Sequence, residues 1–150
     1  MDERPAPPRI EHPEDLVTFG GQVDRVKVSI RFFGDDLDPA YVTGRLGIEP
    51  SAAHRKGDQL PGRYRRIAKQ GSWRLEGNDS LPSVEHQLRL LFDVMTSDLS
   101  VWSELTSRFQ ADVFCGIFLE ADNRGFSLSP QIVTELSKRG LKIDFDIYGK

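Results

Sequence analysis

The stretch Arg25-Val26-Lys27-Val28-Ser29-Ile30-Arg31-Phe32-Phe33 decides the fold class of this chain. Its apolar and polar residues alternate with a period of two, which is typical of a β-strand with one buried face. The same alternation returns in residues 141–148, where Ile143, Phe145 and Ile147 face inward and Lys142, Asp144 and Asp146 face outward. Both segments predict strands of a sheet that is covered on one side.

Two further strands are expected between these segments. Residues 111–121 are apolar on both alternating faces, which favours a central strand. Residues 67–76, which carry Trp73 and Leu75, form the other. We interpret residues 48–66 as irregular, because prolines and glycines interrupt them.

Four helices are predicted from caps and apolar spacing. Asp38-Pro39 and Ser129-Pro130 each supply an N-cap residue followed by Pro at the first helical position, which predicts helices over 39–46 and from Ser129 to Gly140. A third helix opens at Ser80 and Pro82, and a fourth is capped by Ser97 or Asp98. Their core-facing stripes are Val84, Leu88, Leu91, Phe92 and Met95 in the third, and Leu99, Trp102, Leu105 and Phe109 in the fourth.

The segments Leu37–Thr43 and Leu128–Thr134 share Leu, Pro, Val and Thr at identical offsets. Each follows a predicted strand, so the pattern indicates two strand–turn–helix units and a possible internal duplication. The fold class expected is α+β, of the ferredoxin-like, split βαβ type, with an antiparallel-containing sheet and helices packed on one face. Coincidence is the alternative, because helix starts of this kind recur in unrelated proteins.

The length of 150 residues is enough for one ordinary hydrophobic core. We expect residues 1–21 to be a flexible, Pro-rich arm and residues 22–150 to be a single α+β domain. No apolar run approaches the ~20 residues that cross a bilayer, and the charged, Pro-rich start does not resemble a signal peptide. These features predict a cytoplasmic protein without a membrane partner.

The lone Cys115 excludes an internal disulfide, and the three His residues are scattered. We therefore expect neither a zinc site nor any other cofactor, and we interpret Cys115 as a small core residue. The acidic turn at Asp35, Asp36 and Asp38 is able to hold a hard cation, but it lacks the spacing of a calcium loop. Helix capping is the better explanation of this turn.

Charge is distributed unevenly along the chain, although its net value is only −3. Residues 54–74, which we call the basic segment, contain seven Lys and Arg side chains against Asp58 alone, a net charge of +6. The rest of the chain has 13 cationic and 22 acidic side chains, a net charge of −9. Clustered cations create a local potential that attracts anions, whereas the simpler interpretation is a solvated loop.

An ordered set of short motifs points to a family. The set comprises Gly34-Asp35-Asp36-Leu37-Asp38-Pro39, Leu46-Gly47-Ile48-Glu49-Pro50-Ser51, Arg55-Lys56-Gly57-Asp58, Ser72-Trp73 and the closing Asp146-Ile147-Tyr148. In this order the motifs resemble a bacterial family catalogued as domain of unknown function 4279, over roughly residues 25–148. The resemblance implies a small soluble bacterial protein and no established activity, cofactor or catalytic residue set.

The leading hypothesis is a non-enzymatic binding or interaction protein, of regulatory or immunity type, that uses the basic segment. Its candidate partner is an acidic protein or a small anionic ligand. The candidate binding residues are His54, Arg55, Lys56, Asp58, Arg63, Arg65, Arg66 and Trp73. No catalytic residue and no metal ligand is predicted.

Three alternatives stay open. An enzyme acting on a small anionic substrate would use His54, Arg55 and Asp58, whereas Gly57 and Asp58 are also typical of a simple turn. Nucleic-acid binding is disfavoured by the acidic pI of about 5.6, although Tyr64 stands among arginines. A homodimer through exposed sheet surface is suggested by aromatic residues on the second face of strand 111–121, Phe114 and Phe118.

Overall fold

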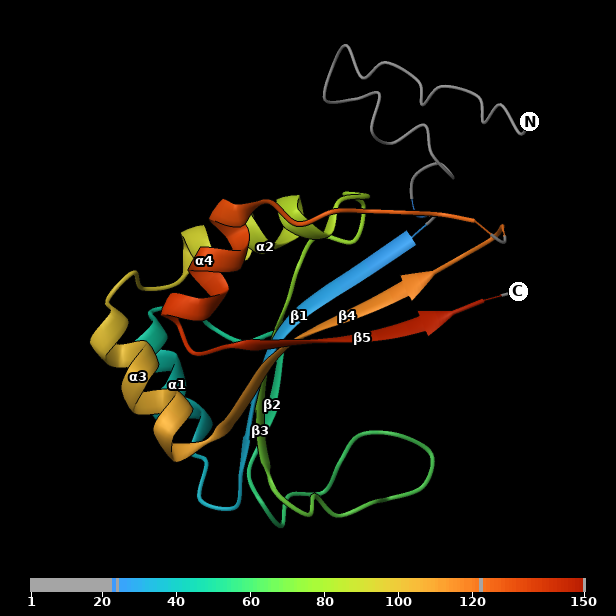
Figure 1. The fold of residues 1–150 in the computed structure, drawn as a ribbon. Coiled ribbons are helices and arrows are strands. Elements are labelled where there is room, and N and C mark those ends of the chain that lie inside the picture. The colour runs from blue at the N-terminus through green and yellow to red at the C-terminus, as the bar shows by residue number, and fades with distance from the viewer. Residues whose placement is uncertain (1–22, 24, 122, 150) are drawn as a thin grey trace, which may run out of the picture.

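The computed structural model describes residues 23, 25–121 and 123–149. The expected arm at residues 1–21 lies outside this part of the chain. Within the described residues, five strands form one mixed sheet and four helices pack beside it, so the fold is α+β (Figure 1). In chain order the elements are β1 (Arg25–Gly34), α1 (Pro39–Leu46), β2 (Ala52–His54), β3 (Gly71–Glu76), α2 (Val84–Val94), α3 (Leu99–Arg108), β4 (Gln110–Phe118), α4 (Pro130–Lys138) and β5 (Lys142–Tyr148).

The strand order in the sheet is β2-β3-β1-β4-β5. β1 pairs antiparallel with β3 on one side and with β4 on the other. β2 pairs antiparallel with β3, whereas β4 and β5 run parallel. The alternating stretch at residues 25–33 is therefore the middle strand, and β2 and β5 are the two edges.

The predicted ferredoxin-like arrangement is not confirmed. The first half does contain a split βαβ unit, because β1 and β2 run in the same direction and β3 lies between them. In the second half, β4 and β5 are direct parallel neighbours with no strand between them. The duplication is not confirmed either, because the strands that flank α1 and α4 are paired differently.

All four helices lie on one face of the sheet (Figure 1). The alternate residues of β1 that face them, Val26, Val28, Ile30 and Phe32, are buried. At the centre of this layer the ring of Phe32 meets Trp73 of β3 edge-on, with 5.8 Å between centroids, and lies 6.1 Å from Trp102 of α3. The hydrophobic core therefore occupies one side of the sheet, as the period-two pattern predicts.

The helix starts follow the predicted caps with one shift. Asp38, Asp98 and Ser129 cap α1, α3 and α4, each accepting a hydrogen bond from a backbone N–H of the first turn. α2 begins later than Ser80 and Pro82 predict, because its cap is Ser83, which accepts from the N–H of His86. The acidic turn before α1 thus has the capping role at Asp38 that its position favours.

The side chain of Gln87 completes the hydrogen bonding of β1 where β3 ends. Gly77, just after β3, still donates its N–H to the carbonyl of Val28 at 2.8 Å. The fully buried amide of Gln87 then accepts from the N–H of Val28 at 3.2 Å and donates to the carbonyl of Val26 at 2.9 Å. Helix α2 is thereby bonded directly to the backbone of the middle strand.

Replacing Gln87 by Leu should destabilise the fold by about 2–4 kcal/mol, because the buried polar groups of Val28 and Val26 would lose their partners. Urea denaturation followed by circular dichroism measures this change. The control is Gln131, which is exposed on α4, and Gln131→Leu should shift stability by less than about 0.5 kcal/mol. Equal effects of the two substitutions would contradict a specific role for the Gln87 amide.

Candidate binding site at the basic hairpin

Residues 57–68 form a short hairpin, which we call the basic finger. The N–H of Gly57 donates to the carbonyl of Ala68 at 2.9 Å, and the N–H of Ala68 donates to the carbonyl of Asp58 at 2.8 Å. Nearer the tip, the N–H of Leu60 donates to the carbonyl of Arg66 at 2.7 Å. The segment interpreted as irregular from its prolines and glycines is therefore organised by its own backbone.

A tight turn forms the base of the finger. Gly57 has a φ of 91°, a left-handed conformation that favours glycine. The carboxylate of Asp58 accepts from the N–H of Arg55 at 2.8 Å, and the N–H of Asp58 donates to the carbonyl of Arg55 at 3.1 Å. Asp58 thus shapes the turn, which is the simpler of the two roles considered for it.

Arg55 and Lys56 are neutralised by the acidic turn before α1. The guanidinium of Arg55 lies 2.8 Å from a carboxylate oxygen of Asp38, and the ammonium of Lys56 lies 3.3 Å from one of Asp35. These pairs attach the base of the finger to the β1–α1 loop. Arg55 and Lys56 therefore anchor the finger, and their charges are already compensated.

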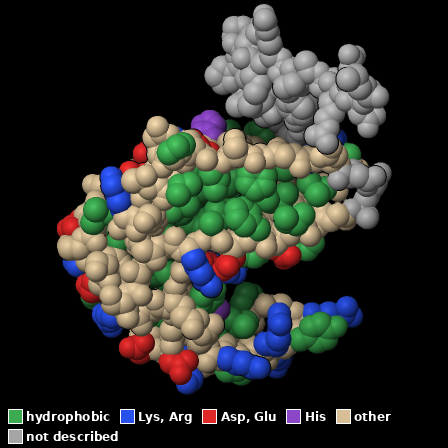
Figure 2. All heavy atoms as spheres, viewed as in Figure 1, with side chains coloured by type: hydrophobic (Ala, Val, Ile, Leu, Met, Phe, Trp, Pro, Cys, Tyr) green, Lys and Arg blue, Asp and Glu red, His purple; other side chains and the backbone are tan. Residues whose placement is uncertain are grey.

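The finger carries three further cations nearer its tip. Arg63, Arg65 and Arg66 are exposed, and none of them forms an ion pair with a described residue. Two large apolar side chains stand among them, with Tyr64 76% and Ile67 59% exposed. Figure 2 shows Lys and Arg side chains gathered on this projecting lobe, with a hollow between the lobe and the rest of the molecule. The finger presents positive charge together with apolar surface.

A cleft of about 680 Å³ lies between the finger and the edge of the sheet. His54 and Ser72, which are partners in the β2–β3 register, line it together with Arg74. Asp58 and Arg66 of the finger form part of the facing wall. The cleft therefore brings a histidine and two arginines to one place, a set of groups suited to an anion.

Trp73 belongs to the hydrophobic core and does not line the candidate site. Its side chain is fully buried on the helix-covered face, and its indole N–H donates to the hydroxyl of Thr43 at 3.0 Å. Ser72 and Arg74, its neighbours on the opposite face, line the cleft instead. The alternation of residues 71–76 would have assigned these faces correctly, because Trp73 shares the parity of the buried Leu75.

The aromatic residues expected to form an open apolar sheet surface are partly covered by other side chains of the chain. The ring of Phe118 stacks on Tyr148, with 4.9 Å between centroids. The guanidinium of Arg31 lies 4.4 Å above the ring of Phe114 and also binds both carboxylate oxygens of Asp112, at 2.8 and 2.7 Å. Phe114 and Phe118 are therefore half-buried and already packed against polar neighbours.

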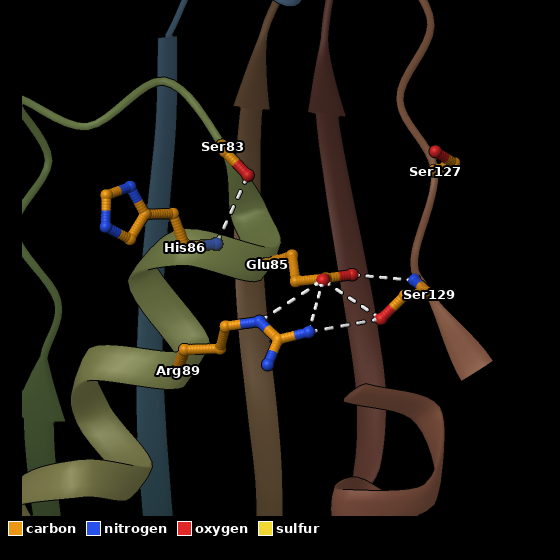
Figure 3. A pocket seen from close by; sticks show the side chains of 6 residues that line it. All are labelled: Ser83, Glu85, His86, Arg89, Ser127 and Ser129. Atoms are coloured by element: carbon orange, nitrogen blue, oxygen red, sulfur yellow. Dashed lines mark hydrogen bonds and ion pairs between the residues drawn. The ribbon is translucent and has the colours of Figure 1, made fainter. Parts of the chain in front are cut away.

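A second hollow, lined by residues of α2 and of the segment before α4, is a structural junction (Figure 3). The carboxylate of Glu85 accepts from the N–H of Ser129 at 2.6 Å, from its hydroxyl at 2.9 Å and from Arg89 at 2.7 Å. In Figure 3 the ring of His86 points away from this carboxylate. Glu85 joins α2 to the cap of α4, and its carboxylate oxygens are already hydrogen-bonded within the chain. The basic finger is therefore the better candidate for a binding site.

Three other findings concern the chemistry and the surroundings of the chain. Burial raises the pKa of the Cys115 thiol to about 12, so this residue behaves as a core side chain without a reactive thiolate. Within the described residues, no group of three or more His, Cys, Asp or Glu side chains is arranged to hold a metal ion. No helix in the same part of the chain is long and apolar enough to cross a membrane.

The fold and the finger define a class of small α+β protein, in which one mixed sheet carries helices on one face and a basic hairpin beside one edge. The family model described as Domain of unknown function (DUF4279) matches residues 24–150, and the chain belongs to this family. No curated protein and no solved structure matches the chain.

The Glu85 junction predicts a pH-dependent contribution to stability. Partial burial acts to raise the pKa of Glu85, but the hydrogen bonds from Ser129 and Arg89 outweigh it and lower the pKa below its ordinary value near 4.5. The contribution is therefore present above the unfolded-chain pKa and is lost as pH falls through the lower folded value. We expect Glu85→Gln to destabilise the chain at neutral pH, and the difference from wild type to vanish in acid.

Thermal unfolding of both proteins across a pH series measures this difference. The control is Glu49→Gln, because Glu49 is exposed and its carboxylate has no hydrogen-bond partner among the described residues. The control should follow wild type at every pH. A Glu85→Gln deficit that persists unchanged in acid would show that the carboxylate charge is not what stabilises the junction.

Proposed function

We propose that this chain is a cytoplasmic, non-enzymatic binding domain that holds an acidic partner protein with its basic finger, as a bacterial regulatory or immunity-type protein does. One observation carries the proposal. Arg63, Arg65 and Arg66 project on an organised hairpin without any ion pair to a described residue. Two cations at its base, Arg55 and Lys56, are compensated within the chain.

The composition of the finger favours a protein partner over a nucleic acid. Tyr and Arg are the residue types enriched at the energetic centres of protein interfaces, and Tyr64 stands directly between two arginines. A nucleic acid would have to approach the acidic remainder of the chain, whose net charge of −9 repels phosphates. An acidic protein patch is able to meet the finger locally and avoid that surface.

The paired variant R63A/R65A tests the proposal against the matched control R45A/K138A. Both variants lose two positive charges, but Arg45 and Lys138 lie on helices and bind Glu104 and Glu135. With a fluorescently labelled polyglutamate peptide at low salt, we expect the finger variant to lose about tenfold or more in affinity and the control to lose much less.

Tagged wild type and both variants are then used to capture partners from a bacterial lysate. The expected result is a partner that wild type and the control retain and R63A/R65A loses. Equal retention by all three proteins would contradict the role of the finger. If a single-stranded oligonucleotide binds more tightly than polyglutamate and depends on the same arginines, the partner class is wrong.

The cleft supports a second candidate function, an enzyme acting on a small anionic substrate. The structure brings His54 and Asp58 to the cleft with Arg66 and Arg74, whereas Arg55 binds Asp38 and does not line it. The candidate thus retains His54 as its general acid or base.

Titration with inorganic phosphate tests this candidate, using backbone amide NMR signals. Saturable shifts confined to residues of the cleft, abolished in the Arg74→Ala variant, would support it. Unchanged spectra at millimolar phosphate would remove it.

A further inference from the structure

The outer edge of β5 is unpaired among the described residues. The strand hydrogen-bonds to β4 on one side, and its last residue, Tyr148, accepts there from the N–H of Leu119 at 2.9 Å. Backbone groups alternate in direction along a strand, so those of Ile143, Phe145 and Ile147 point to the outer edge. Seven residues of strand are therefore available to pair with another chain.

This edge carries charged side chains at Lys142, Asp144 and Asp146, which act against such pairing, but it lacks the other usual devices. It contains no proline. The residues whose backbone groups point to the outer edge carry apolar side chains, with Phe145 42% and Ile147 59% exposed. The ring of Phe126, itself 42% exposed, lies 5.7 Å from that of Phe145 and extends the apolar surface. Figure 2 shows hydrophobic side chains gathered over the part of the molecule where Figure 1 places β5.

The opposite edge of the sheet differs in length and surroundings. β2 has only three residues and borders the cleft next to the basic finger. A partner strand would find few free backbone groups there. β5 is thus the edge suited to strand addition.

We propose that β5 pairs antiparallel with β5 of a second copy of this chain, with Ile143 of each copy opposite Phe145 of the other. In a continuous sheet the side chains of two paired residues must lie on the same face. The allowed registers of β5 against β5 therefore differ from one another by two residues. In this register the backbone groups of Ile143 and Phe145 that point to the outer edge face each other, and they form the hydrogen-bonded pairs of an antiparallel ladder. It also joins the apolar surfaces around Phe145 and Ile147 of the two copies.

Charge complementarity selects this register. It sets Lys142 of each copy opposite Asp146 of the other, so two opposite-charge pairs form at the closer, non-hydrogen-bonded positions. The two Asp144 residues meet at the axis, and each already binds Lys142 of its own chain at 3.4 Å. The neighbouring register, with Phe145 opposite Phe145, sets Asp144 opposite Asp146 twice. Lys142 then lies opposite Tyr148, so no cation of the other copy faces either carboxylate.

The proposal differs from a dimer through Phe114 and Phe118, which are half-buried on the other face of the sheet. It is also independent of the proposed function, because the basic finger lies beside the other edge. A variant that loses self-association should still bind a single acidic peptide through its finger, so the two losses are separate results.

Sedimentation velocity over a range of concentrations tests the proposal with the full chain. The mass of wild type should rise from 17.0 kDa toward twice that value as concentration increases. K142E and D146K each place two like-charged pairs across the interface, and each should weaken dimerisation by about tenfold or more. K138E, on the exposed surface of α4, is the charge-matched control and should dimerise like wild type.

Mixing K142E with D146K gives the decisive measurement. In the mixed dimer the new glutamate faces the new lysine and the remaining Lys142 faces the remaining Asp146, so dimerisation should return to the wild-type level. The double variant K142E/D146K should also dimerise. Far-ultraviolet circular dichroism verifies that each single variant is folded.

Wild type that remains at 17.0 kDa at the highest concentration would overturn the proposal. So would a mixture of the two single variants that stays monomeric while wild type dimerises. Stronger dimerisation of D146K with no effect of K142E would instead identify the register centred on Phe145, and the proposed register would be wrong.

Discussion

The side-chain amide of Gln87 is the interaction on which the arrangement of helices and sheet depends. β3 ends at Glu76, opposite Ser29, so the first residues of β1 have no strand partner on that side. The amide supplies one acceptor and one donor where a longer β3 would have supplied them. A third bond, to the carbonyl of Leu81 at 2.6 Å, also holds the segment that leads into α2. A Cβ at Gly77 would lie only 2.9 Å from the Gln87 amide oxygen, so the glycine keeps this space open.

A chain of polar contacts extends from this point across the helical layer. α2 is fixed on β1 by Gln87, and two residues earlier Glu85 binds the capping residue of α4, Ser129. α4 in turn leads into β5 and ends in a turn where Leu141 donates to the carbonyl of Leu136 at 3.1 Å. These contacts connect the middle strand to the helix that precedes the edge strand, and β5 itself is held by its parallel ladder with β4.

The sequence predicts those features that depend on local chemistry and misses those that depend on where a distant strand ends. Alternation in residues 25–33 and the cap at Asp38 identify β1 and α1 because each signal lies within its own element. β2 and the basic finger become visible only through their partners in β3 and at Ala68. Gln87 lies on the core-facing side of α2, and its buried role depends on the length of β3, which no local pattern contains.

The charge that the candidate site presents also depends on contacts between distant residues. Net charge counts Arg55 and Arg63 alike, but only the structure shows that Arg55 is compensated by Asp38. The finger and β5 lie beside opposite edges of one sheet. Two copies joined through β5 would therefore carry their fingers at the two outer ends, free of the interface. A partner with two acidic patches would then bind the second finger at a raised effective concentration, and self-association would strengthen binding without a new contact.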